Sequence, residues 1–163
     1  MGDNMKIVIV SDSHGKSDIL YDLLEEHHDA EYFLHCGDIE LSEDMFPMYQ
    51  TVRGNNDVFT HYPLEMVVEV PGHRIYMTHG HILNVWNRHD HLVEKAKEHG
   101  CDIACYGHSH ISVIEKHDDV FIINPGSLWR SRDGKGPSYA ILTITEKEVH
   151  AQINFLRLGK EKV

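Results

Sequence analysis

The chain has 163 residues, enough for one domain with a sizeable core and too few for two ordinary domains. Hydrophobic residues make up 41% of it, as in a folded protein, and the formal net charge is −11. That charge disfavours duplex nucleic acid as a partner, because proteins that bind the phosphate backbone usually present a basic surface. We expect a single domain over residues 1–163.

Membrane and secretory features are not expected. No apolar run approaches the ~20 residues that a membrane span requires. The start of the chain lacks the basic and apolar segments of a secretory signal. Cys36, Cys101 and Cys105 show no Cys-x-x-Cys spacing, so they are expected to be buried thiols in a reducing compartment. These features predict a cytoplasmic protein.

The first half of the chain alternates strands and helices. Residues 5–10 are apolar and rich in β-branched side chains, which predicts a buried strand. Ser17 or Asp18 is expected to cap a helix that continues to about His28, with His27 and His28 at the surface. The next predicted elements are a strand, a short helix and a short strand, over residues 32–35, 42–49 and 50–53. This order is typical of a parallel sheet.

The second half is rich in strands. Residues 64–70 and 73–77 flank Pro71-Gly72, which predicts an antiparallel hairpin. A helix is predicted from Arg88 to His99, closed by Gly100. Further strands are predicted over residues 102–106, 112–116, 120–123, 139–145 and 149–158. We therefore predict an α/β fold of two mixed sheets packed face to face, with flanking helices. An exposed apolar hairpin would also be a candidate contact for a homo-oligomer.

Five polar clusters each follow a predicted strand. Because the carboxyl ends of parallel strands form the ligand crevice of an open α/β sheet, we expect these clusters to meet at one place. They are Asp12-Ser13-His14, Gly37-Asp38, Gly54-Asn55-Asn56-Asp57, His79-Gly80-His81 and Gly107-His108-Ser109-His110.

The residue types in these clusters are those that hold two divalent cations at a phosphate. Such cations take oxygen and imidazole ligands, and one carboxylate can bridge two ions about 3.5–4 Å apart. Asp-x-His and His-x-His spacings place both side chains on one face of an extended segment. Each cluster alone is an ordinary turn, cap or surface histidine, so the prediction rests on their combination and order.

The ordered clusters Asp-x-His, Gly-Asp, Gly-Asn, His and Gly-His-x-His resemble the calcineurin-like metallophosphoesterase superfamily. Thr-His-Gly-His, Gly-His-Ser-His and Asn-Pro-Gly-Ser are similar to the small phosphodiesterases of the YfcE type, and the resemblance spans about residues 5–158. It implies a four-layer α/β/β/α sandwich and a metal-dependent phosphodiesterase or phosphatase that acts on a small phosphoester.

The resemblance also implies a role for each metal-site residue. One ion would be held by Asp12, His14 and His110, and the other by Asn55, His79 and His108, with Asp38 as the bridge. A hydroxide between the ions would attack phosphorus. Manganese is the first choice of metal, with iron, nickel, zinc and cobalt as alternatives, because the ligand types do not decide between them.

Two positions depart from the family pattern. Asn56 stands where many members have a histidine that protonates the leaving group, and an amide cannot act as a general acid. His81 is our candidate substitute, with an exposed or supporting histidine as the alternative. The second departure is Leu41, where some members have an acidic residue or arginine.

Two further features near the clusters have open interpretations. The turn over residues 124–127 could bring backbone amides to the site or could be a structural turn beneath it. Arg53 could pair with Asp57 or contact phosphate, and Asp57 could also orient an imidazole ligand.

Two other functions compete with the small-molecule phosphoesterase. The retromer subunit of this fold is a docking scaffold with degraded ligands, whereas all seven ligand positions are filled here. A nuclease is disfavoured by the acidic charge and by the lack of a DNA-binding extension.

Overall fold

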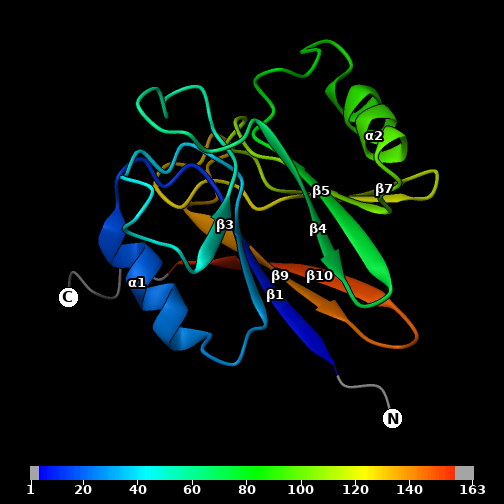
Figure 1. The fold of residues 1–163 in the computed structure, drawn as a ribbon, viewed down its shortest axis with the longest axis horizontal. Coiled ribbons are helices and arrows are strands. Elements are labelled where there is room, and N and C mark those ends of the chain that lie inside the picture. The colour runs from blue at the N-terminus through cyan, green and yellow to red at the C-terminus, as the bar shows by residue number, and fades with distance from the viewer. Residues whose placement is uncertain (1–3, 157–163) are drawn as a thin grey trace.

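The computed structural model describes residues 4–156, which form two five-stranded sheets (Figure 1). The first sheet has the order β10-β9-β1-β2-β3. Its strands are Val149–Phe155, Ser138–Ile144, Met5–Val10, Tyr32–His35 and Tyr49–Thr51. The second sheet has the order β4-β5-β6-β8-β7. Its strands are Glu65–Val70, His73–Thr78, Ile103–Cys105, Val120–Asn124 and Val113–His117.

Both sheets are mixed, as predicted. In the first, β1 is parallel to β2 and β2 to β3, while β9 runs antiparallel to β1. In the second, β5, β6 and β8 are parallel, and hairpins add β4 and β7 at the edges. The loops that follow the parallel strands of each sheet therefore lie at one edge of that sheet.

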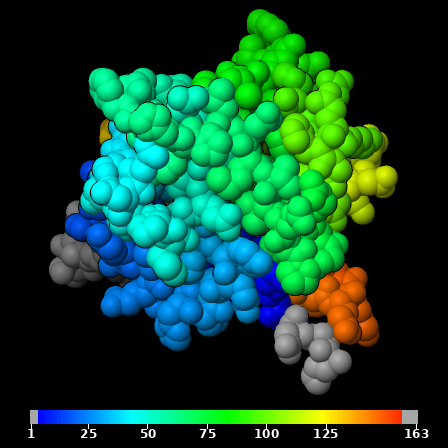
Figure 2. All heavy atoms as spheres, viewed as in Figure 1, coloured from blue at the N-terminus to red at the C-terminus, as the bar shows by residue number. Residues whose placement is uncertain are grey.

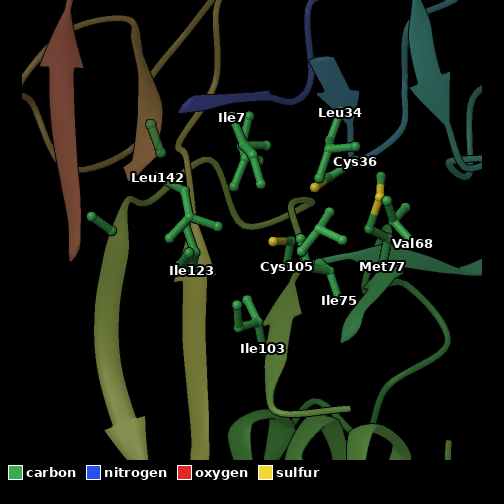
Figure 3. Packing of buried hydrophobic residues seen from close by; sticks show 14 of the residues in the cluster. Ile7, Leu34, Cys36, Val68, Ile75, Met77, Ile103, Cys105, Ile123 and Leu142 are labelled. Atoms are coloured by element: carbon green, nitrogen blue, oxygen red, sulfur yellow. The ribbon is translucent and has the colours of Figure 1, made fainter. Parts of the chain in front are cut away.

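The core lies between the two sheets. Figure 3 shows apolar side chains of both sheets pointing toward one another, among them Ile7, Leu34 and Leu142 from the first sheet and Ile75 and Ile103 from the second. All five are at most 1% exposed. Free, buried Cys36 and Cys105 also lie in this layer, as small apolar groups.

Each helix covers the outer face of one sheet. Helix α1, Ser17–Glu26, packs Leu20 and Leu23 against the first sheet, and α2, Arg88–Glu98, packs Leu92, Val93 and Ala96 against the second. These layers confirm the predicted α/β/β/α sandwich. The part of the chain from α1 through α2 makes up most of the face in Figure 2. Within residues 4–156, no helix has the length and apolarity to cross a membrane.

Two predictions about helices were wrong. Residues 42–48 form turns and coil instead of a helix and Tyr49 begins β3, because Pro47 lacks an N–H and restricts the residue before it. Neither Ser17 nor Asp18 caps α1; the N-cap is Lys16, without a side-chain cap. The preceding loop is held by tertiary bonds, in which His14 N donates to Asp38 O and Gly15 N to Ile39 O. These bonds fix where the helix begins.

Two predictions about exposure were also wrong. His27 is 6% exposed, and its Nε2 lies 2.9 Å from the hydroxyl of Tyr139 on β9. The hairpin of β4 and β5 is not an exposed apolar surface, because Val68 and Val70 are buried in the core between the sheets. The last predicted strand ends at Phe155, and the rest of its predicted length, to Leu158, reaches outside the described residues.

Candidate metal centre

The seven predicted ligands gather where loops leave the parallel strands. Asp12 and His14 follow β1, Asp38 follows β2, Asn55 follows β3, His79 follows β5, and His108 and His110 follow β6. Ligand atoms of Asp12, His14 and His110 lie within 4.8 Å of one another, as do those of Asp12, Asp38 and His79. The His108 ring lies 5.0 Å from that of His79. Asn55 lines a cleft together with His14, Asp38, His108 and His110.

Asp12 is at the centre of this cluster and has a free oxygen. Its Oδ1 lies 3.3 Å from His110 Nε2, 3.7 Å from His79 Nε2 and 3.9 Å from His14 Nε2. Its Oδ2 accepts bonds from the Ser11 hydroxyl at 2.6 Å and His108 N at 3.0 Å. Buried Oδ1 has no hydrogen-bond partner among residues 4–156. An unpaired buried carboxylate oxygen is costly, so this atom fits a bound cation.

Asp38 provides the second carboxylate. Its Oδ2 lies 3.4 Å from His79 Nε2, and that nitrogen is likewise buried without a hydrogen-bond partner in the described part of the chain. Asp38 also forms a group with His14 and Glu40 whose ligand atoms lie within 4.8 Å of one another. One carboxylate is therefore close to histidines from both predicted ligand sets, as a bridging ligand must be.

Three imidazoles are oriented by bonds at their Nδ1 atoms. His79 Nδ1 donates to Cys36 O at 2.8 Å, and His110 Nδ1 donates to Arg130 O at 2.8 Å. His14 Nδ1 contacts the Glu40 carboxylate. Each bond leaves Nε2 as the atom that faces the carboxylates. Histidines that bind metals are usually held in this way, by an acceptor at the other ring nitrogen.

The ionisation states suit a cation site. Burial acts to raise the pKa of Asp12, but the nearby His110, His79 and Ser11 side chains outweigh it and lower the pKa. Burial also opposes ionisation of Asp38, yet His79 and Asn56 hold its pKa well below the usual range. Burial and then His79 lower the pKa of His108 to about 4. At neutral pH the carboxylates are therefore charged and His108 is neutral.

Two glycines leave room for the carboxylates. A Cβ on Gly54 would lie 2.1 Å from Asp38 Oδ1 and 2.4 Å from the Asp38 backbone nitrogen. A Cβ on Gly107 would lie 2.0 Å from Ser11 Oγ and 2.7 Å from Asp12 Oδ2. No side chain fits at either position, because each distance is shorter than van der Waals contact.

The backbone of the site is itself unusual. Six of the seven non-glycine residues with positive φ among the described residues belong to this region. They are Asp12, His14, Asp38, Glu40, His108 and His110, with φ between 46° and 70°. Left-handed backbone is unfavourable for residues with a Cβ and is found where the surrounding structure enforces it, often at functional sites.

Asp57 supports the loops, in a way that neither prediction for it anticipated. It is 1% exposed, and its carboxylate accepts backbone N–H groups of Asp38 at 2.8 Å, Glu40 at 2.8 Å and Gly54 at 2.7 Å. Its oxygens thus fix two ligand loops instead of pairing with Arg53 or an imidazole. Glu40, which orients His14, was also missed. Its spacing two residues after Asp38 was the only signal for it in the sequence.

The turn over residues 124–127 is structural. Ser127 Oγ donates to Asp12 O at 2.8 Å and accepts from the backbone nitrogens of Trp129 and Arg130. Asn124 Nδ2 donates to Ser109 Oγ at 3.1 Å. The turn thus supports the loops after β1 and β6. Side chains beyond it form one wall of the cleft, which has a volume of about 250 Å³: Trp129, Arg130 and Arg132.

The two candidate catalytic residues have different neighbours at the centre. Asn56 lines the cleft, and its backbone and side-chain nitrogens donate to Asp38 at 2.9 and 3.0 Å. The His81 ring lies 5.5 Å from that of His79 and 6.3 Å from that of His108. Burial and then the charge of His79 lower the pKa of His81. A neutral imidazole near pH 7 is poorly suited to donate a proton, so its catalytic role stays a prediction.

Comparison with known proteins assigns most of the chain to the family that the sequence motifs resemble. Residues 5–147 match the model of the calcineurin-like phosphoesterase superfamily domain. The chain is 35% identical to "Probable metallophosphoesterase YsnB" of Bacillus subtilis, over 86% of this chain and 85% of the relative. It is 30% identical to "Phosphodiesterase MJ0936" of Methanocaldococcus jannaschii, over 88% of this chain and 96% of the relative.

Solved structures share the fold. A conserved uncharacterized protein of Streptococcus pneumoniae, described as a predicted phosphoesterase, superposes with a TM-score of 0.88 at 27% identity. The alignment covers 94% of this chain and 90% of that one. Vacuolar protein sorting 29 of Cryptosporidium parvum superposes with a TM-score of 0.75 over 93% of this chain and 97% of that one. At 15% identity, this second likeness concerns the fold alone.

Proposed function

The chain belongs to the calcineurin-like phosphoesterase superfamily, and a relative that is 35% identical is named a probable metallophosphoesterase. We propose that it hydrolyses a small phosphoester at a centre of two divalent ions. Diesters are the favoured class, since a relative of similar length is named a phosphodiesterase and Asn56 supplies no acid for a poor leaving group.

One observation carries this proposal. The buried atoms Asp12 Oδ1 and His79 Nε2 lack hydrogen-bond partners among residues 4–156 and lie 3.7 Å apart. Two buried acceptors without a donor are stable together only if a cation or a proton lies between them. The surrounding donors are oxygen and imidazole, which borderline divalent ions prefer.

The proposed ligand sets follow the predicted ones. Asp12, His14 and His110 would hold one ion, and Asn55, His79 and His108 the other, with Asp38 shared. Bound there, the ions would lower the pKa of a water between them and neutralise charge on the phosphoryl oxygens. Manganese remains our first choice, without a structural feature that excludes iron, nickel, zinc or cobalt.

The cleft wall indicates what the rest of the substrate resembles. Arg130 and Arg132 bring two positive charges beside the ligands, in a protein whose formal charge is −11. Their guanidinium groups can bind a phosphate through paired hydrogen bonds. The Trp129 ring lies 5.1 Å from that of His14, and the Arg130 guanidinium lies 4.4 Å from the indole. This wall suits an anionic ester with a planar group, small enough for a cleft of about 250 Å³.

The alternatives are less well supported. A docking scaffold of this fold does not need unpaired ligand atoms or histidines oriented at Nδ1, both of which are present here. A nuclease for duplex DNA would have to overcome the repulsion of a formal charge of −11, and the basic residues that line the small cleft are Arg130 and Arg132.

The test is a substrate screen with the metal content of the same sample measured. Protein loaded with manganese is expected to cleave bis(p-nitrophenyl) phosphate faster than p-nitrophenyl phosphate. Asp38→Asn should reduce turnover by about 10²-fold or more and retain less metal, because the shared carboxylate is lost. The exposed Asp22→Asn is the matched control and should behave as the parent. Near-parental hydrolysis by a folded Asp38→Asn variant would refute the two-ion centre.

A further inference from the structure

A second group of metal-ligand side chains lies on the outer face of the second sheet. It consists of His89, Glu115 and His117, whose ligand atoms lie within 4.8 Å of one another. None of the three belongs to the centre described above. His89 is in the first turn of α2, and the other two are on β7, the edge strand of the sheet.

The fold explains why these residues meet. Glu115 and His117 are two positions apart on a strand, so they project from the same face. That face is the outer one, because Ile114 between them packs in the core between the sheets. Helix α2 covers the same outer face through Leu92 and Val93, which places its first turn beside β7.

The three side chains already contact one another. His117 Nε2 lies 2.6 Å from Glu115 Oε1, and His89 Nδ1 lies 3.5 Å from the same oxygen. Ligand atoms around a tetrahedral zinc ion lie about 3.3–3.6 Å apart, given bonds of about 2.0–2.2 Å. The distance from Glu115 Oε1 to His89 Nδ1 already has this value, and the distance from Glu115 Oε1 to His117 Nε2 must increase by about 1 Å. Side chains that are 29–49% exposed can make that adjustment.

A buried residue orients the histidine on the helix. The hydroxyl of Tyr106 lies 2.5 Å from His89 Nε2, and Tyr106 is 2% exposed. When Nε2–H donates to this hydroxyl, Nδ1 is left as an acceptor that faces Glu115. This is the arrangement that supports histidine ligands in metal sites, and a histidine without a ligand role does not require it.

We propose that His89, Glu115 and His117 form an additional site for a borderline divalent cation such as zinc, with its remaining coordination position open to water. Two imidazoles and one carboxylate are suitable ligands for zinc, nickel, cobalt or iron(II), and unsuitable for magnesium or calcium. The positive end of α2 and Arg88 oppose a cation, whereas the Glu115 charge favours it. The bound ion would join the start of α2 to the edge strand.

The proposal does not depend on the phosphoesterase function and is tested with zinc alone. Untagged protein is titrated with Zn²⁺ by calorimetry, and retained zinc is measured after gel filtration. His89→Ala and His117→Ala are each expected to bind one equivalent fewer than the parent, or that equivalent at least about 10-fold more weakly. The exposed His150→Ala on β10 is the matched control and should keep the parental number.

Two further variants distinguish this site from the main centre and from unspecific zinc binding. Tyr106→Phe should weaken binding of the same zinc ion by about 10–100-fold. His89 loses its orienting bond in this variant, while the aromatic ring at position 106 stays. Asp38→Asn should lose zinc at the main centre and keep the equivalent assigned to His117. If His117→Ala binds as many zinc ions as the parent with the same affinity, the site does not exist.

Discussion

At the scale of single residues, Asn56 distinguishes this centre from the family pattern. Its amide donates to Asp38 and cannot supply a proton to a leaving group. We expect Asn56→His to increase turnover most for esters with poor leaving groups, up to about 10²-fold. The measurement is the slope of log kcat against leaving-group pKa for a series of aryl phosphodiesters.

The comparison of Asn56→His with the parent needs a control variant that removes His81, the other candidate acid. The lowered pKa of His81 leaves its imidazole mostly without the proton that a leaving group would need. His81→Ala should therefore leave the slope unchanged. If Asn56→His increased kcat equally for all esters, the new imidazole would act by binding the substrate and not as an acid. A selective loss with poor leaving groups in His81→Ala would instead assign the acid to His81.

The residues predicted to bind metal lie together in the structure, and their role as ligands stays a prediction. Asp12, Asp38 and His79 could be predicted because each follows an apolar strand, and parallel strands end at one edge of a sheet. Glu40 and Asp57 were not assigned their roles, because these depend on which backbone groups the folded loops bring to them. Ligand types can be read from a sequence, whereas their supports are set by loop geometry.

At the scale of elements, strands were easier to predict than helix ends. The apolar runs of β1 and β2 are unambiguous, and the turn residues Pro71-Gly72 mark the β4–β5 hairpin. The start of α1 was wrong because bonds between distant loops override local capping preference. The helix expected over residues 42–49 was wrong because Pro47 outweighed the surrounding propensities.

The turn after β3 is the element on which the second carboxylate depends. A Gly54→Ala side chain would overlap Asp38 Oδ1 and the Asp38 backbone nitrogen, and that nitrogen is held by its bond to Asp57. We expect the free energy of unfolding to fall by about 1–3 kcal/mol or more, and metal retention to be lost. Urea unfolding and metal analysis measure the two effects.

A second glycine provides the control for backbone strain. Gly72, in the β4–β5 hairpin, has a φ of +82°, and a Cβ added there would meet nothing within 4 Å. Gly72→Ala should therefore lose about 1–2 kcal/mol from left-handed backbone alone and retain its metal. Equal metal retention in both variants would contradict the role assigned to Gly54.

At the scale of the whole molecule, the sequence predicted the layers but not every buried polar group. Alternating strands and helices followed by strand-rich sequence is typical of two sheets with outer helices. Residue type alone did not show that His27 and His35 are buried, because histidine occurs both inside and outside proteins. Their burial affects how the entire fold responds to acid.

His35 links the stability of the fold to pH. Burial lowers its pKa from 6.5 to about 3, and its Nδ1 accepts a bond from Gly37 N at 3.0 Å. Between these values the unfolded chain binds a proton that the folded chain does not, so stability falls as pH falls. Burial also lowers the pKa of His27, which acts in the same direction.

We expect His35→Asn to remove part of this dependence. Asparagine can still accept from Gly37 but cannot titrate, so the slope of unfolding free energy against pH should decrease by up to about 1.4 kcal/mol per pH unit. Urea unfolding between pH 4.5 and 6 measures the slope above the range where Asp12 and Asp38 contribute. The exposed His28→Asn is the control, and an unchanged slope in His35→Asn would contradict the assignment.

The left-handed backbone at six residues of the centre has an evolutionary consequence. Each such residue carries a conformational cost on the order of 1–2 kcal/mol, which a glycine would avoid. Glycine substitutions at these positions can therefore stabilise the protein while they abolish turnover. In a lineage without selection for hydrolysis, we expect Asp12, His14, Asp38, His108 and His110 to be replaced early while the sheets are retained. The same conflict makes these positions poor targets when stability is raised by substitution.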